Sequence, residues 1–148
     1  MRVALDTNVL VYAEGVNGAP RRKAALAIIE RLPPENTFVP VQVLGELFHV
    51  LVRKARWAPK EARHSILDWH DTLIPIETSP SVLLRAADLS SEHSVGIWDA
   101  VVLSAAAAAG CRFLLSEDLQ AGFTWNGLTI VNPFVEPKHE LLAELLGY

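Results

Sequence analysis

The chain has 148 residues, of which 51% are hydrophobic and 20% are charged, and its formal net charge is −4. This length suits a single domain with a full hydrophobic core, and the composition argues against a disordered chain. The net charge neither supports nor excludes a nucleic-acid partner, because two divalent cations bound at acidic side chains would bring it to zero.

Short apolar segments alternate with helical patterns along the chain, and no repeat, linker or low-complexity tract interrupts them. The expected strands are 3–5, 37–39, 74–76, 113–115 and 128–131. The expected helices are 20–32, 41–55, 59–73, 80–93, 98–109 and 137–146. Short apolar strands separated by helices predict an α/β protein with a parallel sheet covered on both faces. We expect one domain over 1–148.

The first predicted strand ends on an acid. Asp6 directly follows 3–5, and Thr7 and Asn8 come next at the start of another apolar stretch. In open α/β sheets, ligands bind outside the carboxyl ends of the strands. Asp6 is also an ordinary helix cap, so its position alone leaves both interpretations open.

The helix predicted over 41–55 has one apolar stripe at core spacing. Its members are Leu44, Leu47, Phe48 and Leu51. Glu46 lies on the opposite side, in a polar stripe with Gln42, His49 and Arg53. That stripe is either a solvated face or the wall of a wet cleft, and the helix alone favours the solvated face. Gly45 costs about 1 kcal/mol of helix stability relative to alanine, which predicts close backbone packing there.

Asp99 opens the helix predicted over 98–109, which is apolar nearly all round. Such a helix is buried in a protein interior. The helix dipole favours a carboxylate in the first turn, so a capping role is one interpretation of Asp99. An acid at the mouth of an otherwise dry helix indicates a functional role more strongly.

Asp118 lies in a setting that matches that of Asp6. It follows the buried strand 113–115 as Asp6 follows 3–5. In a parallel sheet, both strands deliver their acids to the same edge. Either acid alone is as well explained by a turn or a cap, but four acids in matching settings require a chemical explanation.

Four ionised carboxylates at one site repel one another, which raises some of their pKa values unless cations neutralise them. Oxygen ligands without histidine or cysteine suit Mg²⁺ or Mn²⁺. The natural chemistry of such a site is metal-assisted hydrolysis of phosphodiester bonds.

These residues, in this order and spacing, resemble those of PIN-domain ribonucleases, specifically the VapC-type toxins of VapBC toxin–antitoxin systems. The resemblance is carried by Asp6-Thr7-Asn8, Leu44-Gly45-Glu46-Leu47, Trp98-Asp99-Ala100 and Leu114-Leu115-Ser116-Glu117-Asp118-Leu119. It implies a PIN-like three-layer α/β/α fold with a central parallel sheet. It also implies an endoribonuclease that depends on Mg²⁺ or Mn²⁺.

Carried over to this sequence, the resemblance implies one catalytic metal site. Its acids are Asp6, Glu46, Asp99 and Asp118. Thr7 and Asn8 would hold Asp6 and water molecules, and Ser116 keeps the hydroxyl of the threonine that is common in the family. Glu117 is not assigned to the site, because adjacent residues of a strand point to opposite faces.

The resemblance also implies a cognate antitoxin and a homodimer. The apolar segments 9–12 and 24–29 are candidates for the dimer contact, although core packing is their simpler use. Basic residues near the acids are candidates for RNA contacts, together with Trp57. They are Arg53, Lys54, Arg56 and Lys60. The alternative is a solvated corner between two helices.

Other classes fit less well. The five histidines show no pairing suited to a histidine ribonuclease, and no G-x-S-x-G, P-loop or G-x-G-x-x-G motif is present. A receiver domain would need a lysine after a late strand and a central aspartate, and neither is suitably placed. Two alternatives stay open: a housekeeping RNA-processing PIN nuclease, and a catalytically idle PIN-like binding module.

The sequence also gives an expectation for the cellular compartment of the protein. The single cysteine, Cys111, excludes an internal disulfide, and no cysteine–histidine cluster has zinc-site spacing. Asp6 interrupts any signal-peptide pattern, and the longest apolar run, 100–111, is shorter than the roughly 20 residues that span a bilayer. We therefore expect a cytoplasmic protein without a membrane anchor.

Overall fold

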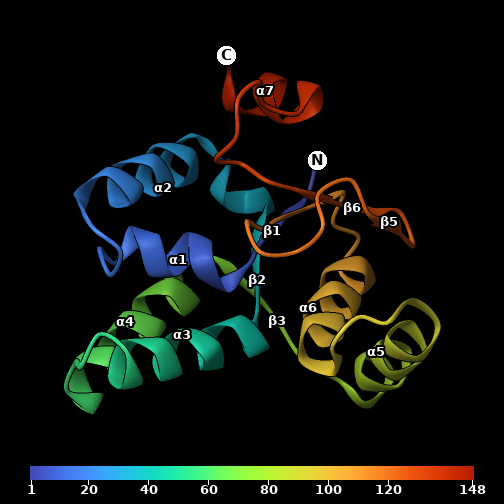
Figure 1. The fold of residues 1–148 in the computed structure, drawn as a ribbon, viewed down its shortest axis with the longest axis horizontal. Helices are drawn as coiled ribbons and strands as arrows, with labels where there is room; N and C mark the ends of the chain where they lie inside the picture. Colours follow the sequence, from blue (N-terminus) through green and yellow to red (C-terminus); the bar gives the residue numbers. More distant parts are fainter.

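The computed structural model describes residues 1–148, and its centre is one six-stranded sheet in the order β3-β2-β1-β4-β6-β5 (Figure 1). The strands are β1 (Val3–Leu5), β2 (Thr37–Pro40), β3 (Ile74–Ile76), β4 (Phe113–Leu115), β5 (Thr124–Trp125) and β6 (Leu128–Val131). The first four and β6 run parallel, which confirms the predicted parallel sheet for five strands.

The edge of the sheet differs from the prediction. Strand β5 pairs antiparallel with β6 and was not expected. Asn126 and Gly127 connect the two strands, both with positive φ (47° and 81°). Asn-Gly is the dipeptide that favours a tight two-residue hairpin, because its conformation matches the twist of the flanking strands. This short signal in the sequence marks the antiparallel edge.

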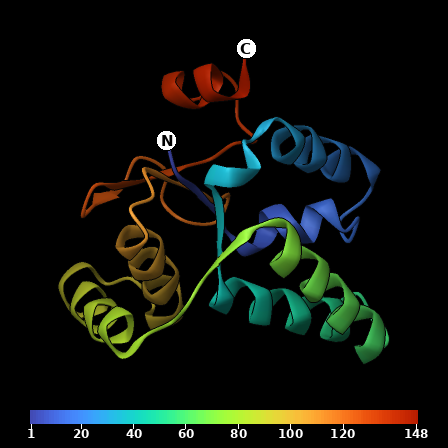
Figure 2. The same cartoon turned by 180° about the vertical axis from the view of Figure 1, so that it is seen from behind.

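Helices cover both faces of the sheet. They are α1 (Thr7–Ala13), α2 (Ala19–Arg31), α3 (Val41–Arg53), α4 (Pro59–Thr72), α5 (Pro80–His93), α6 (Ile97–Ala108) and α7 (Glu140–Leu146), with a 3₁₀ turn η1 (Pro34–Asn36). Figures 1 and 2 show α1 to α4 on one side and α5 with α6 on the other. The expected three-layer α/β/α arrangement is therefore confirmed.

Most predicted helix boundaries agree with the structure to within two residues, and the last helix is the exception. It begins at Glu140 rather than 137, because His139 has extended backbone angles and its ring accepts a hydrogen bond from the backbone N–H of Leu141. A side chain in that role ends the preceding loop and starts the helix.

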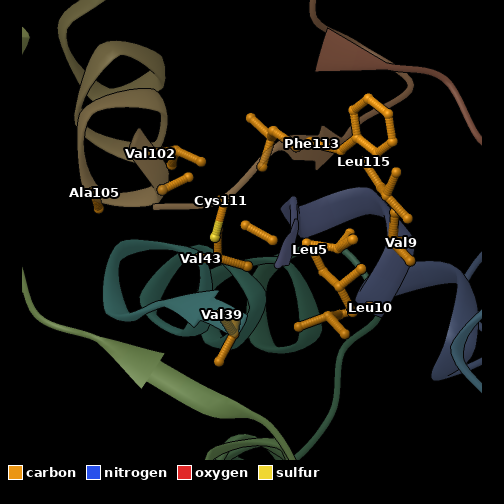
Figure 3. Packing of buried hydrophobic residues seen from close by; sticks show 14 of the residues in the cluster. Leu5, Val9, Leu10, Val39, Val43, Val102, Ala105, Cys111, Phe113 and Leu115 are labelled. Atoms are coloured by element: carbon orange, nitrogen blue, oxygen red, sulfur yellow. The ribbon is translucent and has the colours of Figure 1, made fainter. Parts of the chain in front are cut away.

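The hydrophobic core lies between the sheet and its helices. Helix α6 is buried from Ala100 to Ala106, as its apolar composition predicts. Figure 3 shows Cys111 beside Val43 and Phe113, within this core. Burial raises the pKa of the Cys111 thiol to about 12, so this cysteine is an apolar packing residue.

The two apolar segments considered for a dimer contact are placed differently from each other. Residues 9–12 are buried in the core, so they offer no surface to a second copy. In α2, Ala25 and Ile28 are buried, while Ala24 is exposed. None of the helices has the length and apolar character that crossing a membrane requires.

Candidate functional site

Two neighbouring strands bring Asp6 and Asp118 to the same edge of the sheet. Strands β1 and β4 pair in parallel with Leu5 opposite Leu115, and each is followed directly by the loop or cap that carries its acid. The backbone N–H of Asp6 donates to the carbonyl oxygen of Leu115 at 3.0 Å. The strand register therefore fixes where the first acid lies relative to the second.

Both carboxylate oxygens of Asp6 accept hydrogen bonds. Oδ1 accepts from the backbone N–H of Thr7 at 2.8 Å, and Oδ2 accepts from the hydroxyl of Ser116 at 2.7 Å. Ser116 is fully buried, and its oxygen also accepts from the N–H of Leu119 at 3.2 Å. Ser116 thus ties Asp6 to the loop that carries Asp118.

The two residues after Asp6 hold two of the other acids, Glu46 and Asp118. The Thr7 hydroxyl donates to Oε2 of Glu46 at 2.6 Å, and the Gln42 amide donates to Oε1 at 3.2 Å. The side-chain amide of Asn8 donates to Asp118. The expectation that Thr7 and Asn8 both hold Asp6 is therefore wrong for Asn8. Of these two residues, Asn8 donates to Asp118 instead, and Thr7 donates to Asp6 through its backbone N–H.

Asp99 lies in the first turn of α6, exposed, with no hydrogen bond or ion pair to its carboxylate. Its partial withdrawal from water raises the pKa of this carboxyl, and the charges of Glu46 and Asp118 raise it further. The charges of these two acids therefore act on Asp99, and its membership of a shared metal site stays a prediction. Gly96 precedes the helix, and a Cβ there would lie 3.9 Å from Oδ2 of Asp99.

Negative charge at this site is not neutralised by the protein. Burial raises the pKa of Asp6 to about 6; the hydrogen bonds from Ser116 and Thr7 oppose the rise, and the charges of Glu46 and Asp99 add to it. None of the ion pairs in the structure involves any of the four acids. A buried carboxylate beside like charges is stabilised by a bound cation.

The donor set fits a hard divalent cation. No three histidine, cysteine, aspartate or glutamate side chains stand close enough to hold a metal ion jointly. Mg²⁺ keeps several water ligands and binds through one or two carboxylates, so such a closed arrangement is not required. Four oxygen-only side chains without a cationic neighbour therefore suit Mg²⁺ or Mn²⁺ and do not suit a closed zinc site.

A cavity of about 410 Å³ adjoins two of the acids, Glu46 and Asp118, and their hydrogen-bond donors. Its lining is Thr7, Asn8, Gln42, Gly45, Glu46, His49, Val50 and Asp118. Gln42, Glu46 and His49 of the polar stripe on α3 therefore line this cavity, in agreement with the wet-cleft alternative, and His49 is at the same time exposed to solvent. Sequence reasoning missed His49 and Gln42 as site residues, although their spacing from Glu46 placed them on its side of the helix.

Glu117 faces away from the four acids. Its carboxylate accepts a hydrogen bond from the Tyr12 hydroxyl and pairs with Arg21 at 3.3 Å. The Arg21 guanidinium also lies over the Tyr12 ring, 4.9 Å from its centroid. This cluster anchors the loop after β4 to α1 and α2, on the side opposite Asp118.

The basic residues considered for RNA binding do not line the acidic cavity. Arg53 and Lys54 are exposed at the end of α3, and Arg56 is exposed in the following loop. Lys60 lies in the first turn of α4 and lines a separate cavity. RNA contacts by these four side chains stay a prediction.

Comparisons with known proteins agree with this fold. A family model described as PIN domain matches residues 3–122. No curated protein matches the chain in sequence. Among solved structures, a toxin–antitoxin complex from Klebsiella pneumoniae is similar with 19% identity and a TM-score of 0.67, over 89% of this chain and 98% of the other.

Two further structures show the same fold. VapC20 from Mycobacterium tuberculosis, described as a sarcin-ricin loop cleaving toxin, has 16% identity and a TM-score of 0.66, over 78% of this chain and 89% of that one. VapBC2 from Rickettsia felis, bound to a promoter DNA fragment, has 21% identity and a TM-score of 0.61, over 80% of this chain and 89% of that one.

The raised pKa of Asp6 predicts that the metal-free protein loses stability as the pH rises. Its pKa is about 6 in the folded chain against an ordinary value of 3.8, so the folded state binds more protons between these values. This stabilisation is fully present below an ordinary pKa of 3.8 and is lost as the pH rises through about 6, a change on the order of 3 kcal/mol. Denaturant unfolding without divalent cations, from about pH 4 to about pH 7, measures this loss. Asp6→Asn should flatten the profile, and an identical slope in both proteins would contradict the assignment.

Gly45 does not mark close packing, contrary to the expectation from sequence. A Cβ at this position would meet no atom within 4 Å, and the residue is exposed on the cavity wall. Gly45→Ala should therefore raise the free energy of unfolding by about 1 kcal/mol, through helix propensity alone. Gly127→Ala is a matched control with the opposite sign, because φ is +81° there. A lower melting temperature of the Gly45→Ala variant would contradict this prediction, because it would show that Gly45 is closely packed.

Proposed function

The chain belongs to the PIN-domain family, and we propose that it is a metal-dependent endoribonuclease acting as the toxin of a toxin–antitoxin pair. One observation carries this proposal. Hydrogen bonds from Ser116, Thr7 and Asn8 bring Asp6, Glu46 and Asp118 together at the carboxyl edge of the sheet, and no ion pair compensates these carboxylates. The catalytic and metal-site residues we assign are Asp6, Glu46, Asp99 and Asp118.

The chain's own residues orient this site before any substrate arrives. Asp6 is fixed through both oxygens, Glu46 is held by Thr7 and Gln42, and Asp118 is held by Asn8. Carboxylates held in place by hydrogen bonds lose little freedom on binding a cation. Asp99 has no such donor, so its carboxylate is free to turn toward a bound cation or water molecule.

Mg²⁺ or Mn²⁺ bound here would lower the pKa of a water molecule and offset negative charge on the scissile phosphate. The four carboxylates would hold the ion and orient the attacking water, whose proton one of them would accept. Attack on phosphorus would break the bond to the 3′ oxygen, which would take up a proton to leave as a 3′ hydroxyl, and the other product would bear a 5′ phosphate.

RNA is the proposed substrate. Its phosphates need positive charge, since the acidic edge alone would repel them. The exposed cations beyond Glu46 on the same helix and its following loop, Arg53, Lys54 and Arg56, are the proposed contacts. Lys60 is a weaker candidate because it lines a different cavity.

The toxin role is supported by the kind of proteins that share this fold. The structure from Klebsiella pneumoniae is a toxin–antitoxin complex, and VapC20 is described as a sarcin-ricin loop cleaving toxin. By this likeness we propose a cognate antitoxin as partner, a homodimer as the working form, and action in the cytoplasm.

The test of this proposal is cleavage of total cellular RNA in Mn²⁺, with sequencing of the new 5′ ends. We expect discrete cuts that bear 5′ phosphates. Asp99→Asn should reduce the cleavage rate by at least about a hundredfold, because it removes one charge of the metal site while the fold is kept. Asp88→Asn, which removes an exposed acid on α5, is the matched control and should cleave normally.

Two results would contradict the proposal. Cleavage by Asp99→Asn at the rate of the unmodified chain would remove that residue from the site. Mn²⁺ binding without any cleavage, in a folded protein, would favour a binding module without nuclease activity.

A further inference from the structure

A second cavity, of about 490 Å³, lies between the end of α1 and α4, and shares no residue with the cavity at the four acids. Its lining is Glu14, Trp57, Lys60, Glu61, His64, Ser65 and Asp68. Figure 1 shows α4 beside α3 and below α1, on the opposite side of the sheet from α6. We propose that this cavity binds the side chain of an arginine that a partner protein presents.

The charge of the cavity selects a cation. Glu14, Glu61 and Asp68 bring three carboxylates, and none of them forms an ion pair in the structure. Lys60 is the one cationic side chain that is always charged in the lining. A phosphate group would meet more negative than positive charge here, which disfavours RNA as the occupant.

The aromatic wall favours a planar cation. Trp57 is half-buried and packs against the core, and its backbone N–H donates to the carbonyl of Leu51 at 2.9 Å, so its position is fixed. A guanidinium group stacks on an indole ring while its edge donates to carboxylates. The compact ammonium of lysine offers no flat face for this contact.

One carboxylate is already oriented for such a donor. Oε1 of Glu14 accepts a hydrogen bond from the indole N–H of Trp69 at 2.8 Å. That bond leaves Oε2 without a protein donor. A charge-assisted hydrogen bond from a guanidinium would use this oxygen without disturbing the existing contact.

The Ser65 hydroxyl is independent evidence that this cavity binds a ligand. This residue is 7% exposed, and its hydroxyl is the one buried side-chain polar group of the chain without a hydrogen-bond partner. Buried hydroxyls are normally paired with protein, water or ligand. A guanidinium has five N–H donors, enough to serve the carboxylates and this oxygen together. No group of acids and histidines here is suited to a metal ion.

The test is a nuclear magnetic resonance titration of the full chain with N-acetyl-arginine amide. The indole signals of Trp57 and Trp69 should shift in a saturable manner, while that of Trp125, on strand β5, stays in place. The matched citrulline derivative, which has the same shape without the charge, should shift neither. These outcomes do not depend on nuclease activity, so they stand or fall separately from the proposed function.

Substitutions in the cavity lining test where the arginine derivative binds. Glu61→Gln combined with Asp68→Asn should weaken arginine binding by at least about tenfold, the loss expected for two charge-assisted hydrogen bonds. Glu30→Gln with Glu35→Gln changes the net charge equally at exposed positions outside the cavity and should bind normally. Ser65→Ala should raise the melting temperature of the free chain yet weaken arginine binding, which a purely structural role would not do.

Five results would overturn the inference. Four of them are the absence of a saturable shift, equal binding of the citrulline derivative, unchanged affinity in the double variant, and displacement of the bound arginine derivative by an RNA oligonucleotide. A shift of the same signals on dilution, without any added probe, would assign the cavity to a second copy of this chain and would also overturn it.

Discussion

Uncompensated negative charge at the carboxyl edge of the sheet is the constraint on which the rest of this structure depends. Asp6 is half-buried there, and its withdrawal from water, together with the charges of Glu46 and Asp99, raises its pKa to about 6. A protein that only needed a helix cap would not withdraw a carboxylate from water next to like charges. A divalent cation bound at this site would offset the cost of withdrawing the Asp6 carboxylate from water beside these charges.

Hydrogen-bond donors around the acids hold these carboxylates in place. The consecutive residues Thr7 and Asn8 reach Glu46 on α3 and Asp118 after β4, and Ser116 reaches Asp6 from the buried end of β4. One short segment therefore ties together the first strand, a central helix and a late loop. Such ties fix the spacing of like charges that would otherwise separate.

The alternation of apolar strands and helices sufficed to predict the layers and the five parallel strands, because burial of both faces dictates that pattern. The strand-end acids were also predictable, since parallel strands end at one edge. The roles of Gln42 and His49 as cavity wall were not, because a polar helix face looks the same in sequence whether it meets water or a cleft. The second cavity is lined by Glu14, at the end of α1, and by Ser65 in α4, about fifty residues apart in the chain. No local sequence pattern predicts that these two segments lie side by side.

The most direct test of the central claim is Mn²⁺ binding followed by electron paramagnetic resonance, in the full chain and in Asp6→Asn, Glu46→Gln and Asp118→Asn. If the acids form one site, the unmodified chain should bind Mn²⁺ saturably, and each substitution should weaken that binding. Glu92→Gln, which removes an exposed acid from α5, should leave it unchanged. No binding by the unmodified chain, or the same affinity in every variant, would contradict the claim that these carboxylates act together.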